Sequence, residues 1–278
     1  MYGAPIATCS LILLNIVVSI AGFYNLSLFE GYKFQVDKIL VKKDFIRLLS
    51  SGFLHTGWLH LFFNMWALYS FGNALEAMLG PWSFLLIYFA SLLGGGAFSL
   101  IVHRHHADYS SAGASGAVCG LIFAFIALLP GADMGLFLLP IRIPGWLFGL
   151  LFVIISIYGI RSQRQNIGHD AHLGGAVIGM LVAILLHPEV VAVNYVAILI
   201  VLVPAVIFTY IIITRPQALL VDNLFFKEHA GTYTLDDRYN LAKGERQREL
   251  DRLLEKISRS GIHSLSVKER QRLEEYSK

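Results

Sequence analysis

Charged side chains and cysteines are both scarce in this sequence. Only 15% of the 278 residues are Asp, Glu, Lys or Arg, 56% are hydrophobic, and the mean hydropathy is +0.62. This balance excludes an ordinary soluble globular domain and is typical of a chain that crosses a membrane several times. The two cysteines, Cys9 and Cys119, lie in apolar segments. Their placement argues against a disulfide framework and against a cysteine-based metal site.

Other signals are missing as well. The sequence has no HExxH pair, which excludes a zinc membrane protease of that type. The formal net charge of +3 is small and dispersed, so nucleic acid is not an expected partner. The N-terminus lacks the basic region and cleavage site of a signal peptide, and we expect it to form a first spanning segment. No lysine follows the glycines at positions 94–96, which are interpreted as a close-packing site and not as a phosphate loop.

Seven apolar segments are candidates for spanning helices, which need about 20 residues each. The fourth, fifth and sixth are short, which favours helix ends that are buried in protein or open to a water-filled cavity. We therefore predict an all-α fold, a polytopic transmembrane helical bundle. The seven segments are residues 4–23, 58–78, 82–102, 115–129, 146–160, 172–187 and 190–213.

The chain changes character after the last apolar segment. Residues 1–214 contain nine Lys/Arg and eight Asp/Glu, whereas the remaining 64 residues contain 13 and 11. We predict a membrane part over residues 1–214 and a small soluble helical tail over 215–278.

Two patterns indicate helices in the tail. Ser266 and Glu269 have the spacing of a capping box, and four apolar residues follow an i, i+3, i+4, i+7 pattern. These four are Leu250, Leu253, Leu254 and Ile257. A docking or regulatory tail with a binding protein of unknown identity and a merely solvated tail fit the sequence equally well. Near the other end of the chain, the loop over residues 24–57 is long and amphipathic, and we expect it to lie on the membrane surface.

Polar residues are costly inside a membrane and mark functional sites. Ser115 opens the fourth segment, within the stretch SAGASGAVCGLIFAFIALL, and His172 opens the sixth. His60 and Asn64 lie four residues apart near the start of the second segment and share a helix face. Because alternate helices run in the same direction, we expect these starts to lie on one side of the membrane.

Small residues predict that the fourth and sixth segments pack closely. Such packing would bring Ser115 within hydrogen-bonding distance of His172 and form a Ser–His dyad, with His172 Nε2 as the general base. His60, Asn64 and the backbone N–H of Ser115 would donate to the oxyanion. The predicted packing residues are Gly113, Gly116, Gly120, Gly175 and Gly179.

Three stretches together resemble the rhomboid intramembrane serine proteases. They are FLHTGWLHLFFNMWALYSFGNALEAMLG, GASGA and AHLGGAVIG, and the resemblance covers about residues 5–187. It implies that the membrane part divides into a six-helix catalytic core with a water-filled cavity, over residues 1–187, and a seventh, additional transmembrane helix over 188–214. It also implies that Ser115 is the nucleophile and His172 the base, with His60 and Asn64 on the oxyanion side. Single-pass transmembrane proteins would be cut at or near the membrane surface, with no cofactor, metal or nucleotide.

Three features depart from the family pattern. Some relatives place an aromatic ring four residues after the serine, packed on the histidine, where this chain has Cys119, so the His172 ring needs support from elsewhere. The long first loop lacks the Trp-Arg pair of some relatives. The resemblance implies a bacterial inner membrane protein whose active site faces the extracytoplasmic side, yet its outer loops would then hold most of the basic residues, contrary to the positive-inside rule.

Other interpretations stay open beside the protease. Taken alone, Ser115 fits a helix cap in a packing face, and His60 with Asn64 fits an ordinary polar pair. A catalytically silent rhomboid-like protein that binds membrane clients is the main alternative. A transporter or channel is less favoured, because it predicts polar residues along the whole pathway and here they gather at one depth.

Three polar residues and one polar run outside the predicted dyad are given other roles. Asp170 is not interpreted as a triad acid, because two residues of separation place it on a different helix face from His172. His169 is expected at the rim of the site, and Glu76 is assigned to tying helix ends together. The run HRHH, which begins at His103, is interpreted as a polar surface turn in preference to a metal site.

Overall fold

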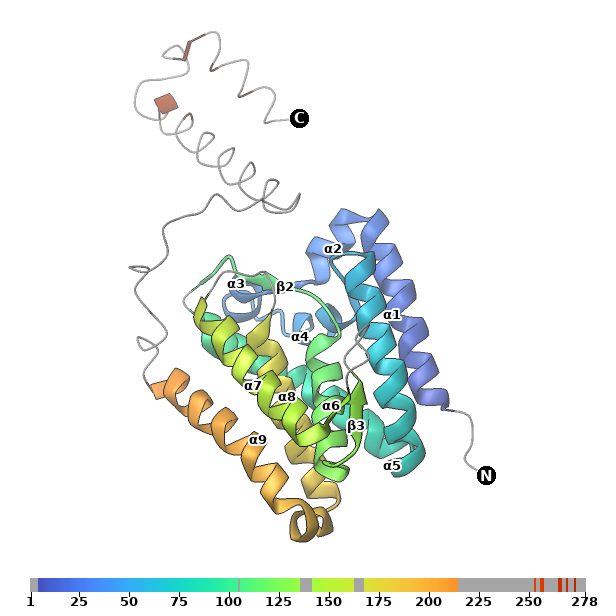
Figure 1. The fold of residues 1–278 in the computed structure, drawn as a ribbon. Helices are drawn as coiled ribbons and strands as arrows, with labels where there is room; N and C mark the ends of the chain where they lie inside the picture. Colours follow the sequence, from blue (N-terminus) through green and yellow to red (C-terminus); the bar gives the residue numbers. More distant parts are fainter. Residues whose placement is uncertain are drawn as a thin grey trace. The chain divides into compact units, whose positions relative to one another are not determined.

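The structure, a computed structural model, describes residues 5–104, 106–135, 142–162 and 168–214 and seven positions nearer the C-terminus. These are Leu253, Lys256, Ile257, Leu265, Ser266, Glu269 and Leu273. The chain divides into two compact units, Met1–Val221 and Asp222–Lys278. Helices make up most of the first unit (Figure 1). The domain boundaries after residues 187 and 214 stay predictions.

The first unit contains the predicted bundle of apolar helices. Four of them are long and apolar enough to cross a membrane, while α6 and α7 are shorter apolar helices. The all-α transmembrane bundle is therefore confirmed. The two short helices, α6 and α7, correspond to the fourth and fifth predicted segments, which are among the three predicted to be short. The bounds are α1 Ile6–Tyr24, α5 Trp58–His103, α6 Ser115–Leu128, α7 Gly145–Ser162, α8 His169–Leu186 and α9 Glu189–Thr214.

Helix α5 is one run of 46 residues with a break near its middle. Gly80 has a φ of 77°, which is non-helical and readily adopted only by glycine, and Pro81 follows it. The break lies between the two segments predicted over 58–78 and 82–102.

Helix α6 lies at the centre of the core. Eleven of its 14 residues are buried, and α5, α6 and α8 pack most extensively against one another. Backbone meets backbone in this layer, because a Cβ added at Gly175 would collide with the carbonyl of Gly116, and one added at Gly179 with the carbonyl of Gly120. The glycine pairs thus let α6 and α8 approach as closely as two helices can.

The three consecutive glycines at positions 94–96 of α5 lie at further close approaches. A Cβ at Gly95 would lie 2.5 Å from the carbonyl oxygen of Ala171, and a Cβ at Gly94 would lie 2.5 Å from Ile178 Cγ1. A Cβ at Gly96 would lie 3.1 Å from Leu48 Cδ2. The predicted close-packing role of this triplet is confirmed.

The loop between α1 and α5 is built of short elements. They are α2 Leu26–Tyr32, β1 Phe34–Gln35, α3 Val36–Leu40, α4 Arg47–Ser50 and the 3-10 helix η1 Ser51–Phe53. β1 pairs antiparallel with β2 Ser110–Ser111, which lies just before α6. A second hairpin pairs β3 Asp133–Gly135 with β4 Arg142–Pro144. The loop is therefore joined by hydrogen bonds to the segment that leads into α6.

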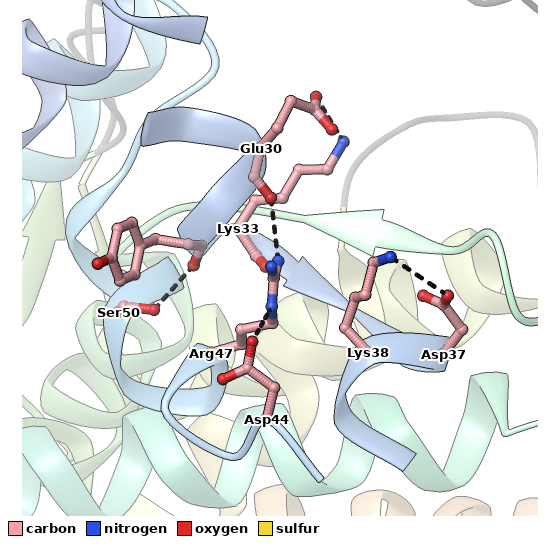
Figure 2. Close-up of polar contacts among 8 residues, drawn as sticks. Glu30, Lys33, Asp37, Lys38, Asp44, Arg47 and Ser50 are labelled. Atoms are coloured by element: carbon pink, nitrogen blue, oxygen red, sulfur yellow. Dashed lines mark hydrogen bonds and ion pairs between the residues drawn. The ribbon is translucent and has the colours of Figure 1, made fainter. Parts of the chain in front are cut away.

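A buried arginine fastens this loop to itself, as Figure 2 shows. Arg47 Nη1 donates to the carbonyls of Glu30 (3.1 Å) and Lys33 (2.8 Å), and its Nε donates to Asp44 Oδ2 at 2.7 Å. A buried guanidinium needs partners for its donors, and three of the five N–H groups are bonded here. These bonds connect separate parts of the loop; its position on the membrane surface stays a prediction.

Glu76 ties α5 to the start of α1. Its carboxylate accepts hydrogen bonds from the backbone N–H groups of Ala7 (2.9 Å) and Thr8 (2.8 Å) and from the Thr8 hydroxyl (2.7 Å). The first backbone N–H groups of a helix have no partner within it, so this carboxylate caps α1 from another helix. The structural role predicted for Glu76 is confirmed.

Helix α9 is attached to the end of α6. Asn194 Nδ2 donates to the carbonyls of Ala127 (3.0 Å) and Leu128 (3.1 Å). These are carbonyls of the last turn of α6, which lack partners within that helix. The appended helix thus caps the helix that begins with Ser115.

In the second unit, the capping box is confirmed. Ser266 N donates to Glu269 Oε2 at 2.7 Å, and Glu269 N donates to Ser266 Oγ at 3.3 Å. A hydrogen bond from Lys256 is the main reason that the pKa of Glu269 falls to about 2. Leu253 is buried and helical and Ile257 is half-buried, while Leu250 and Leu254 lie outside the described residues.

Candidate active site

The predicted nucleophile and base lie next to each other. Ser115 is the first residue of α6, and its Oγ is 2.6 Å from His172 Nε2. Helix α8 begins at His169, so His172 lies in its first turn and does not open the helix as predicted. The glycine contacts between α6 and α8 set this separation. Such a contact is within the range in which an imidazole accepts the proton of a serine hydroxyl.

His60 faces the same point as the serine hydroxyl. A Cβ added at Gly113 would lie 3.0 Å from His60 Nε2 and 3.6 Å from Ser115 Oγ. Gly113 has a φ of 144°, in the region that other residues rarely adopt. Its prediction as a helix-packing glycine is wrong in its place, because Gly113 lies in the loop before α6. A Cβ there would lie 2.8 Å from His60 Cε1, so the glycine lets the loop backbone approach the His60 ring.

Asn64 is buried one turn deeper on α5. Its Nδ2 donates to the carbonyl oxygen of His60 at 2.9 Å, which fixes the amide against its own helix. The amide nitrogen carries a second hydrogen, so one donor remains beyond this bond.

The side chain of Thr56 adjoins the other nitrogen of the His60 ring. Thr56 Oγ1 lies 3.1 Å from His60 Nδ1. If the hydroxyl donates to Nδ1, the neutral ring carries its hydrogen on Nε2, the nitrogen that faces Gly113. In that arrangement, Thr56 would favour the tautomer in which His60 is a donor toward the site.

A buried histidine that the sequence analysis did not single out holds the loop before Ser115. His55 is 0% exposed, and its Nε2 accepts from the backbone N–H of Ala114 at 3.4 Å. Its Nδ1 therefore carries the hydrogen and donates to Ser19 Oγ (2.8 Å), which donates to the carbonyl of Phe53 (3.0 Å). Burial, with a smaller effect of nearby His60, lowers the pKa of His55 to about 3. This chain of bonds needs the neutral ring.

Asp170 is used away from the dyad. Its carboxylate accepts from Tyr109 Oη at 3.3 Å and lies 3.4 Å from His103 Nε2. The His103 ring stacks on Tyr109, with 3.5 Å between centroids. Burial, followed by the charge of Asp170, raises the pKa of Tyr109. The exclusion of Asp170 as a triad acid agrees with these contacts.

After His103, the described residues of the HRHH run form the predicted polar surface turn: Arg104 and His106 are exposed, and His106 N donates to the carbonyl of His103 at 2.8 Å. His103 itself is the last residue of α5 and packs in the Asp170 cluster. Within the described ranges, no three His, Cys, Asp or Glu side chains gather as metal ligands would.

The comparison with known families agrees with the arrangement of these helices. A model of the Rhomboid domain matches residues 42–189, slightly more than half of the chain. The chain belongs to the rhomboid family. A family of unknown function (DUF6576) matches residues 233–278, within the predicted tail.

Several known rhomboid proteins are similar over part of their length. Rhomboid protein 1, mitochondrial, of Saccharomyces cerevisiae is 34% identical over 61% of this chain and 50% of the yeast protein. Rhomboid protease GluP of Bacillus subtilis is 32% identical over 58% of the chain and 30% of GluP. Rhomboid protease AarA of Providencia stuartii is 28% identical over 66% of the chain and 73% of AarA. The match to this chain thus covers half or less of the length of the first two relatives.

These relatives come from mitochondria as well as bacteria, and they include proteins named as proteases. Together with the apolar helices, they make this chain an integral membrane protein of a family that contains serine proteases.

Proposed function

We propose that the chain is an intramembrane serine endopeptidase that uses a Ser115–His172 dyad. The observation that carries the proposal is the 2.6 Å separation of Ser115 Oγ and His172 Nε2. The dyad is formed by two helices whose backbones are in contact, so its geometry is set before a substrate arrives.

The reaction follows from the positions of the two side chains. His172 Nε2 accepts the hydroxyl proton while Ser115 Oγ attacks the scissile carbonyl, and the proton then passes to the leaving amine. The acyl-enzyme is hydrolysed when His172 takes a proton from water and returns it to Ser115.

The negative oxygen of the tetrahedral intermediate needs donors. We assign this role to the backbone N–H of Ser115, to Nε2 of His60 and to the free amide hydrogen of Asn64. His60 Nε2 and Ser115 Oγ both lie close to Gly113, so the proposed donors converge on the region of the nucleophile. A donor of this kind contributes about 10²- to 10³-fold in rate.

The substrates are proposed to be single-pass transmembrane proteins. An extended backbone must reach Ser115, so segments with small or helix-breaking residues near the cut are expected to be preferred. The partners in this proposal are such a protein and the lipid bilayer.

The first test is cleavage of a tagged single-pass protein by the purified enzyme in proteoliposomes. Ser115→Ala and His172→Ala are expected to abolish cleavage. Ser70→Ala and His187→Ala are matched controls, because Ser70 is exposed on α5 and His187 lies at the far end of α8. Cleavage that survives both dyad substitutions would refute the mechanism.

A fluorophosphonate probe separates the protease from a silent client-binding protein. The enzyme is expected to be labelled at Ser115, and the label should disappear in Ser115→Ala. Absence of labelling in the folded wild-type protein would favour the client-binding alternative.

The proposed location is a bacterial inner membrane, with the active site on the extracytoplasmic side. The test is protease accessibility of the tail in intact cells, compared with permeabilised cells. With the predicted helices and a cytoplasmic N-terminus, an odd number of crossings places the tail outside. Protection of the tail in intact cells would contradict this topology.

A further inference from the structure

We propose that His169 is a positioning residue that supports the ring of the base His172. The proposal rests on the proposed Ser115–His172 dyad. It goes beyond that dyad, because the GASGA and AHLGGAVIG motifs assign His169 no role. His169 would touch neither the substrate nor the reacting atoms; it would act by limiting the orientations of His172.

The first observation is the contact between the two rings. Their centroids are 6.1 Å apart and the planes are inclined at 74°, which is an edge-to-face arrangement. Both residues lie in the first turn of α8, three positions apart, so they share a face of the helix. Edge-to-face pairs at this distance are attractive beyond their buried area.

The second observation is the space reserved for the His169 ring. Gly159 of α7 lies directly against it, because a Cβ added at Gly159 would lie 2.5 Å from His169 Nε2 and 2.6 Å from Cγ. A side chain at residue 159 would therefore push the ring out of its place. The ring of His169 is thus enclosed between the backbone of α7 and the ring of His172.

The third observation concerns the side chain that α6 places one turn after Ser115. Cys119 lies one turn after Ser115 on α6, is buried and has a free thiol. The thiol of a cysteine is small and presents no flat surface against which an imidazole packs. The histidine on α8 therefore provides the aromatic contact that α6 lacks.

The neighbouring residue shows that this turn is fixed on a second side. Asp170 is 4% exposed and is bound by Tyr109 and His103. With the helix turn fixed there, the freedom left to His172 is rotation of its side chain. That rotation is what the His169 ring restricts.

The experiment compares three variants of the full chain in proteoliposomes. His169→Ala removes the ring, His169→Phe keeps an aromatic ring without its nitrogens, and Gly159→Ala displaces the ring. Gly149→Ala is the matched control on α7, since its Cβ would meet Val201 and Ile126 instead of the site. For each variant, kcat, KM and the fluorophosphonate labelling rate are measured, after a thermal unfolding curve has established that it folds.

The expected result is a loss in kcat with KM nearly unchanged. His169→Ala and Gly159→Ala should each lower kcat and the labelling rate about tenfold, and His169→Phe should stay within about threefold of wild type. In the His169→Ala background, Gly159→Ala should cost no more than about twofold, because both changes remove one contact.

Three outcomes overturn the proposal. They are a His169→Ala variant with wild-type kcat, a folded His169→Phe variant as slow as His169→Ala, and a Gly159→Ala loss of equal size in both backgrounds. If His169→Ala does not fold, the Phe and Gly159 variants decide the matter. A folded wild-type protein without labelling at Ser115 overturns the protease and the positioning role together, whereas labelling that is equal in wild type and His169→Ala overturns only the latter.

Discussion

At the residue scale, the backbone before Ser115 is held by the loop that precedes α5. Gly113 N donates to the carbonyl of Ser51 at 2.9 Å, and Ala114 N donates to His55 Nε2 at 3.4 Å. The nucleophile is therefore held by two sets of contacts. One is the packing of α6 on the glycines of α8, and the other is the pair of hydrogen bonds from this loop. Both bonds come from residues more than 50 positions away in the sequence.

The neutral state of His55 predicts a dependence of stability on pH. Its pKa in the folded protein, about 3, lies below the ordinary value of 6.5. Between these values the unfolded chain binds the proton more readily, so the free energy of unfolding falls as the pH is lowered below about 6.5, by up to about 1.4 kcal/mol per pH unit for this group. Above about pH 6.5 the contribution of the neutral ring is complete.

Unfolding curves in detergent between about pH 4 and pH 7 check this dependence. His55→Gln does not titrate and is expected to be less stable at pH 7 but to lose less stability on acidification. His106→Gln, at an exposed histidine, is the control and should keep the wild-type slope. An unchanged slope in His55→Gln would show that other groups set the acid sensitivity.

The hydroxyl of Thr56 predicts a rate effect through His60. Thr56→Val removes the donor to Nδ1, so the ring no longer needs to carry its hydrogen on Nε2, and kcat should fall about tenfold. Thr56→Ser keeps the hydroxyl and should stay within about threefold of wild type. The measurement is cleavage in proteoliposomes, with Thr214→Val as a control. Equal rates for the Val and Ser variants would exclude a role for the tautomer.

At the element scale, the site depends on contacts between helix backbones. Helix α6 meets α8 through two pairs of glycines, and Gly95 of α5 meets α8 at the carbonyl of Ala171. Side chains larger than hydrogen would separate these helices, and the dyad spans that same interface. Packing and chemistry therefore depend on the same residues.

Capping of α1 by Glu76 predicts a loss of stability when the charge is removed. Glu76→Gln keeps the shape but replaces a carboxylate oxygen by a donor that faces two backbone N–H groups, so about 1–3 kcal/mol of unfolding free energy should be lost. The measurement is thermal unfolding in detergent. Glu189→Gln, on an exposed helix end, is the control and should change little. A Glu76→Gln variant as stable as wild type would show that solvent or lipid replaces the cap.

Much of this arrangement was predictable from the sequence, because it depends on local patterns. Apolar length predicts the spanning helices, the Gly80–Pro81 step separates the two halves of α5, and small residues around Ser115 predict the contact with α8. His55 and Thr56 were not singled out, although they stand in the same FLHTGW stretch. They lie outside any periodic helix, and their partners Ala114 and His60 become visible only once the loop is folded.

Two other features lie beyond sequence patterns for a similar reason. β1 and β2 have two residues each, too few to show an alternation of polar and apolar side chains. The partners of Arg47 are mainly backbone carbonyls, which leave no mark in the sequence.

At the scale of the whole molecule, the residues of the proposed site belong to one compact unit. Ser115, His172, His60 and Asn64 all lie within Met1–Val221, and the C-terminal unit begins at Asp222. The match to a family of unknown function lies in that second unit. We therefore predict that the proposed chemistry does not require the tail.

Removal of the tail tests this separation. A chain that ends at Val221 is expected to keep kcat within about threefold of the full-length protein and to show a similar thermal unfolding midpoint. The measurement is cleavage of the same single-pass substrate by both proteins in proteoliposomes, with Ser115→Ala in each background as the blank. A drop of tenfold or more would assign the tail a part in activity.

The length of α6 has a consequence for the choice of membrane. Its 14 residues rise about 21 Å, whereas the hydrocarbon layer of a bilayer is about 30 Å thick. Asn194 joins the C-terminal end of α6 to α9. We therefore expect the missing length to lie at the Ser115 end. Thicker bilayers would place the hydroxyl deeper and thinner ones nearer to water. Acyl-chain length is therefore a physical control on how far a substrate helix must leave the lipid before it reaches Ser115.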